Sequence, residues 1–75
     1  MPTIDFNKPI EVFWALTEEV TSARFLRAQI AQVGRYEIEW RNKRWTVDVD
    51  NLVIGPTEET GFLAEDFQVR NVAAN

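Results

Sequence analysis

The stretch RYEIEWRNKRWTVDVD, residues 35–50, decides the fold class of this chain. Apolar and polar residues alternate on both sides of Asn42-Lys43, a pattern typical of a β-hairpin with one buried face. A slip of one residue would turn that whole face to water, so we expect the register to be strongly specified. A two-residue loop at Asn42-Lys43 predicts three facing pairs: Trp40 with Trp45, Ile38 with Val47, and Tyr36 with Val49.

Residues 17–34, which precede the hairpin, allow a helix as one interpretation. Thr17 suits an N-cap, and Gly34 suits the position just beyond a helix C-terminus. Several apolar residues also fall on one helical face: Val20, Ala23, Leu26, Ile30 and Val33. This interpretation gives an α+β fold, in which a helix over residues 18–33 packs on a three-stranded sheet.

A strand is the other interpretation of the same segment, and we favour it. If Gly34 ends a three-residue loop, Leu26, Ala28 and Ile30 face the apolar side chains of the hairpin. The residues Val20-Thr21-Ser22 are also poor helix formers. Unbroken pairing would bring Arg24 into the core, so we expect a bulge near Ser22–Arg24.

Shorter alternating runs complete an all-β fold. Ile10, Val12, Trp14 and Leu16 alternate with other residues, whereas 52–54 is a short apolar segment that Gly55-Pro56 ends. We predict one domain, residues 1–75, built as a small antiparallel meander or SH3-like barrel of about five strands. The expected strands lie at about 9–16, 22–31, 35–41, 44–50 and 67–72.

Composition restricts the chemistry of this chain. It has no His and no Cys, which removes the commonest general base, the commonest metal ligand and any thiolate. We therefore expect no enzyme, no cofactor and no metal site. The net charge of −4 weighs against binding to nucleic-acid phosphates. No apolar run approaches the roughly 18 residues of a membrane span, and no signal sequence is apparent, so we expect a cytoplasmic protein.

The basic tip of the hairpin is the first candidate contact site. Arg41, Lys43 and Arg44 form the only positive cluster in the sequence. Such a tip can meet phosphate, RNA or an acidic protein. The plainer interpretation is a solubilising turn, in which Asn42 tolerates the positive φ that a hairpin loop needs.

Two phenylalanines form the second candidate site. In the strand interpretation, Phe13 and Phe25 lie on the face of the sheet opposite to Trp14 and Leu26. If nothing covers them, they form an exposed apolar patch and therefore an interface. The alternative is that C-terminal residues cover them: Phe62, Leu63 and Phe67.

Acidic residues dominate the outer face of the predicted hairpin. The predicted register places Asp50 opposite Arg35, but it also places Glu37 opposite Asp48. A like-charged pair in that position is unfavourable. A solvated face is the plainest interpretation of these carboxylates.

Both ends of the chain resemble small, mostly uncharacterised phage and prophage proteins. Those proteins open with an Asp-x-x-Lys-Pro-[Ile/Val] frame and close with an Asp-[aromatic/Leu]-x-Val-x-Asn-Val strand. The resemblance implies a viral or mobile-element origin and a mostly antiparallel β fold, and no functional residue is carried over from it. The matching residues are Asp5, Lys8, Pro9 and Ile10, and then Asp66, Phe67, Val69, Asn71 and Val72.

These observations favour a non-enzymatic protein–protein interaction module. We expect it to bind a protein partner through a sheet edge or through the Phe13/Phe25 face. Self-association is also expected, because a chain of this size builds only a small core. The alternative is a small-barrel protein that binds nucleic acid through the basic hairpin tip.

Overall fold

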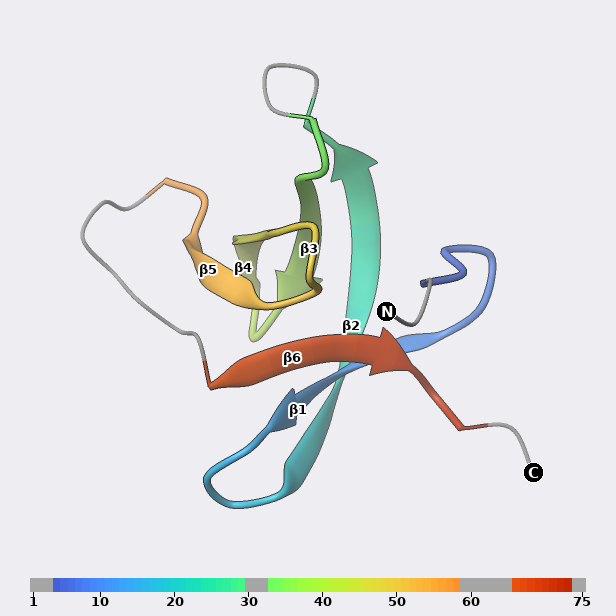
Figure 1. Ribbon diagram of the computed structural model, residues 1–75, viewed down its shortest axis with the longest axis vertical. Coiled ribbons are helices and arrows are strands. Elements are labelled where there is room, and N and C mark those ends of the chain that lie inside the picture. Colours follow the sequence, from blue (N-terminus) through green and yellow to red (C-terminus); the bar gives the residue numbers. More distant parts are fainter. Residues whose placement is uncertain (1–3, 30–32, 59–65, 74–75) are drawn as a thin grey trace.

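The computed structural model is a single antiparallel sheet that curls into a half-barrel (Figure 1). It describes residues 4–29, 33–58 and 66–73. No helix occurs in these ranges, so the all-β prediction is confirmed and the helix interpretation of residues 18–33 is wrong for its described part. The strands are β1 (Ile10–Trp14), β2 (Glu19–Ala28), β3 (Tyr36–Trp40), β4 (Lys43–Val47), β5 (Val53–Pro56) and β6 (Phe67–Asn71), in the order β5-β4-β3-β2-β1-β6.

The long strand β2 joins the two halves of the sheet. Its first half pairs with β1 and its second half with β3, so the sheet bends along this strand. The curl brings the two edge strands towards each other (Figure 1). There Val69 N donates a hydrogen bond of 2.8 Å to Asn51 O, and Leu52 forms a β-bridge with Gln68.

The core lies on the concave face of the sheet. Alternate side chains of each strand point towards this face. On β1, Ile10 and Val12 are buried as predicted, whereas Leu16 lies in the turn that follows and is 72% exposed. The apolar face predicted for the central hairpin is confirmed except at Val49, which is exposed. The buried apolar residues are Ile10, Val12, Tyr36, Ile38, Trp40, Trp45, Val47, Val53 and Val69.

The register of the β3–β4 hairpin differs from the prediction by two residues. The loop is Arg41-Asn42, and Tyr36 pairs with Val47 in place of Val49. Ile38 accordingly pairs with Trp45. Since side chains repeat every two residues along a strand, a shift of two leaves every side chain on its predicted face.

Turn geometry and charge both favour the observed register. Arg41 and Asn42 have φ angles of 54° and 63°, as the two central residues of a type I′ hairpin turn require. Glu39 now opposes Arg44, and Glu37 opposes Thr46. The unfavourable pair of Glu37 with Asp48 is thereby avoided.

The bulge in β2 lies further along the strand than predicted. It falls between Phe25 and Arg27, and Phe25 pairs with Ile38. Arg24 pairs with Glu39 on the outer face, so no bulge is needed near Ser22–Arg24 to keep it out of the core. Of the three residues predicted to face the hairpin core, Leu26 is half-buried, Ala28 pairs with Tyr36 but is exposed, and Ile30 lies outside the described residues.

Strand β5 was not predicted as a strand. Gly55-Pro56 has the composition of a chain break, yet both residues pair with β4, opposite Thr46 and Trp45. A proline is tolerated here because β5 is an edge strand, whose outer side needs no donor. The sheet therefore has six strands where about five were expected.

Nothing in the described part of the chain forms a helix of the length and apolarity that spanning a membrane requires.

Candidate interaction surfaces

The first surface is the convex face of β6, β1 and the start of β2. Ile10 and Val12 point into the core. The side chains of Glu11 and Phe13, which alternate with them, therefore point outward. Phe13 stands in one row with Gln68 of β6 and Val20 of β2. Phe13 is half-buried, and Val20 is 48% exposed. This row places apolar surface on the outside of the sheet.

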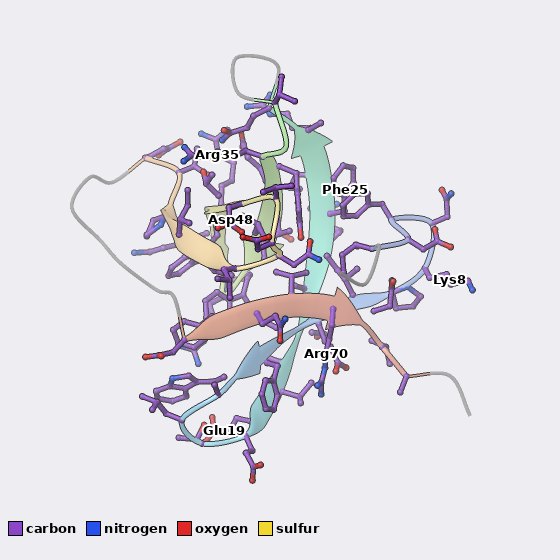
Figure 2. The ribbon with its side chains drawn as sticks, in the orientation of Figure 1. Lys8, Glu19, Phe25, Arg35, Asp48 and Arg70 are labelled. Atoms are coloured by element: carbon purple, nitrogen blue, oxygen red, sulfur yellow. The ribbon has the colours of Figure 1, made fainter. Side chains whose placement is uncertain are left out.

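Arg70 crosses from β6 to cover part of this row. Its guanidinium carbon lies 4.5 Å from the centre of the Phe13 ring, a cation–π contact. Its Nε donates a hydrogen bond of 2.7 Å to Glu11 Oε2. Glu11 is buried, so the ion pair also compensates the desolvation of that carboxylate. Figure 2 shows Arg70 projecting from β6 beside β1.

Phe25 does not share this surface, and that part of the prediction is wrong. Ala23, two residues earlier, pairs with Ile10, and Phe25 pairs with Ile38, so its ring lies on the core side of the sheet. It stacks on Phe6 at a ring separation of 4.0 Å and lies near Tyr36. Figure 2 shows Phe25 on the side of β2 that faces the N-terminal segment. Among the described residues, Phe6 in the lead-in to β1 covers it.

Of the C-terminal residues predicted to cover the phenylalanines, the structure describes only Phe67. Phe67 stacks on Trp14 at 5.3 Å and contacts Trp40 at 4.9 Å, so it belongs to the core side. Phe62 and Leu63 lie outside the described residues. The cover of Phe13 that the structure describes comes from Arg70 of β6.

The cations of the hairpin tip are engaged by neighbouring side chains. Arg41 lies over the Trp40 ring at 4.6 Å and over the Phe67 ring at 5.9 Å. Arg44 forms ion pairs with Glu37 and Glu58. Lys43 is exposed at the start of β4. The predicted cluster therefore exists, but its two arginines are partly neutralised or stacked.

The outer face of the second half of the sheet carries ion pairs and not free carboxylates. Arg24 pairs with Glu39 at 3.1 Å, and Arg27 lies 3.5 Å from Glu37. Glu37 is only 5% exposed, so the expectation of a solvated carboxylate is wrong at this residue, whereas Glu39 and Asp50 are exposed as expected. Side chains of the neighbouring strands cover it, so this face is polar but partly desolvated.

A hollow of 320 Å³ opens beside the hairpin tip. It is lined by Asn42, Lys43, Arg44, Pro56 and Glu58. The tip and the turn after β5 thus contribute opposite charges to one concave site. Nothing in the sequence indicated it, because β5 was not recognised as a strand.

No group of three or more acidic side chains close enough to hold a metal ion occurs within residues 4–29, 33–58 and 66–73.

Comparison of the chain with known protein families, with curated proteins and with solved structures gave no match. The resemblance of its two ends to phage and prophage proteins stays a prediction.

Proposed function

We propose that this chain is a non-enzymatic protein-interaction module that contacts its partner through the convex face of β6, β1 and the start of β2. The observation that carries the proposal is the Arg70 guanidinium over the Phe13 ring, next to the exposed Val20. Aromatic residues and arginine are enriched at the centres of protein interfaces. An apolar row with a stacked arginine is therefore the part of this surface best suited to a protein partner.

Arg70 is held in place before any partner arrives. Its Nε is committed to the buried Glu11, and its side chain remains 46% exposed. No described residue accepts a hydrogen bond from its terminal nitrogens, so these can donate to a carbonyl or carboxylate of the partner. A preorganised side chain loses less entropy on binding than a mobile one.

The rest of the outer sheet face is less suited to this role. Arg24 and Glu39, and likewise Arg27 and Glu37, already neutralise one another across β2 and β3. A partner covering them would have to desolvate charges that gain no new contact. This contrast favours contact at Phe13 and Val20.

Substitution of the exposed Val20 gives the sharpest test. The tagged chain and its Val20→Glu variant would each capture proteins from an extract of the source cell, and each captured protein would be tested for direct binding with purified components. We expect Val20→Glu to lose the partner, because a charge then enters the apolar row. Val49→Glu is the matched control, since Val49 is a 66% exposed valine outside this row. Equal binding of the partner by both variants would reject this face as the binding surface.

Two further measurements separate the alternatives. Binding to a single-stranded oligonucleotide at low salt, falling steeply as salt rises, would favour the basic tip and a nucleic-acid partner. Sedimentation of the purified chain tests whether the partner is a second copy. A dimer that Val20→Glu dissociates and Val49→Glu leaves intact would place self-association on this face.

A further inference from the structure

The hollow beside the hairpin tip contains an arginine that is anchored from beneath. Arg44 Nη1 lies 3.5 Å from Glu37 Oε1. That oxygen is buried and accepts no hydrogen bond from the described residues, so the Arg44 charge is its principal compensation on this side. Separating the two would leave a buried carboxylate partly unpaired, which is costly. Arg44 is thus kept in one position.

The other side of the same guanidinium faces the hollow. Arg44 Nη2 contacts Glu58 Oε1, and the Glu58 side chain is 76% exposed. An ion pair this exposed contributes little to stability, because water screens it and holding two long side chains costs entropy. Glu58 can therefore leave Arg44 at small cost, whereas Glu37 cannot.

The remaining lining of the hollow suits a peptide with an acidic side chain. Lys43 adds a second positive charge, and Asn42 adds an amide at the turn. Pro56 supplies a buried apolar wall from β5. The group that now contacts the outer nitrogen of Arg44 is itself a carboxylate, carried by Glu58 in the turn after β5. A partner carboxylate therefore matches this site in charge.

We propose that this hollow binds an acidic side chain of a partner peptide, and that Glu58 occupies the same guanidinium nitrogen until the peptide displaces it. Glu58 then acts as a built-in competitor that lowers the affinity for the peptide. The proposal is independent of the Phe13 face, since the two surfaces share no residue.

Nuclear magnetic resonance titration tests the site directly. The probe is a capped peptide, acetyl-Glu-Glu-Val-Glu-amide, and its control is acetyl-Gln-Gln-Val-Gln-amide. We expect the acidic peptide to shift the backbone amides of Lys43, Arg44, Thr57 and Glu58, and the control peptide to leave them unchanged. Shifts confined to other strands, or equal shifts with the control peptide, would overturn the proposal.

Two variants separate competition from a general charge effect. Glu58→Gln should tighten binding about two- to five-fold, which corresponds to losing one exposed ion pair. Glu19→Gln removes the same charge from an exposed position at the start of β2 and should leave the affinity unchanged. An equal gain in both variants would reject competition by Glu58.

Lys43→Gln should weaken binding of the acidic peptide without disturbing the buried Glu37. Arg44→Gln should abolish it, but this change can also unfold the chain, so the conclusion rests on Lys43→Gln and Glu58→Gln. If an oligonucleotide shifts the same amides, and its binding falls more steeply with salt than that of the peptide, the ligand of this site is nucleic acid and the peptide proposal is wrong.

Discussion

The Tyr36 hydroxyl donates a hydrogen bond of 3.0 Å to the Asn51 side-chain oxygen inside the core. Tyr36 begins β3, and Asn51 lies in the turn after β4 with a φ of 65°. The Asn51 carbonyl in turn accepts the hydrogen bond from Val69 of β6. Asn51 therefore connects the central hairpin with the C-terminal strand.

Removing this hydroxyl should destabilise the fold. Tyr36→Phe leaves the buried Asn51 oxygen without its donor, and we expect a loss of about 1–3 kcal/mol in the free energy of unfolding, measured by chemical denaturation. In an Asn51→Gly background the oxygen is absent and glycine accepts the positive φ, so Tyr36→Phe should cost much less there. Equal costs in the two backgrounds would show that the hydrogen bond contributes nothing.

The same tyrosine predicts how stability depends on pH. Burial, and secondarily the charge of Asp48, raises the pKa of Tyr36 above the value of about 10 for a solvated tyrosine. Above that pH the unfolded chain loses the phenolic proton while the native chain keeps it, so the free energy of unfolding falls as pH rises. This contribution is fully present below about pH 10 and is lost as pH rises towards the folded pKa.

Denaturation curves recorded on either side of about pH 10 measure this effect. In the Tyr36→Phe variant, the unfolding free energy should fall less steeply with pH, by the contribution of one proton. Tyr36 is the only tyrosine in the chain, so tyrosinate absorbance reports on it alone. We expect that absorbance to appear together with unfolding. Ionisation near the solvated pKa in a chain that remains folded would contradict the prediction.

Two valines distinguish the observed hairpin register from its alternative. Val47 is fully buried and opposes Tyr36, whereas Val49 is 66% exposed. Val47→Ala should therefore cost about 2 kcal/mol of unfolding free energy. Val49→Ala should change it by less than about 0.5 kcal/mol. In a register with Val49 facing Tyr36 both valines would be buried, so a cost for Val49→Ala as large as that of Val47→Ala would support that register.

The backbone conformation of the Arg41-Asn42 turn leads to a separate prediction. Asn42 has a φ of 63°, which asparagine and glycine adopt more readily than alanine does. Asn42→Ala should lower the free energy of unfolding by about 1 kcal/mol, and Asn42→Gly should leave it nearly unchanged. Thermal unfolding of the two variants measures the difference. Indistinguishable melting temperatures would argue against the left-handed turn.

The sequence predicted the faces of the strands better than their pairing. Alternation placed Val12 and Ile38 in the core, because burial acts on each strand separately. It did not determine the hairpin register, since a shift of two residues buries the same face. Turn conformation at Arg41-Asn42 and cross-strand charge decided between the two arrangements. The bulge after Phe25 depends on how β2 meets both neighbours, which no local pattern reveals.

The candidate surface was only half visible in the sequence. Phe13 stood out as an apolar residue on the outward side of a strand, but Arg70 did not. Arg70 and Glu11 are 59 residues apart and meet only because β6 pairs with β1. One signal was available: Glu11 and Arg70 each lie next to a buried valine on opposite ends of the chain. That signal needs the strand pairing before it can be interpreted.

The pairing of β6 with β1 has a consequence for the order of folding. The β3–β4 hairpin closes a loop of two residues, whereas the Glu11–Arg70 contact closes almost the whole chain. Closing a longer loop costs more entropy, and folding slows as contacts become less local. Addition of β6 is therefore expected to be a late step. Until it occurs, Val12 lacks its partner Val69 and β1 remains an open edge that another chain can pair with.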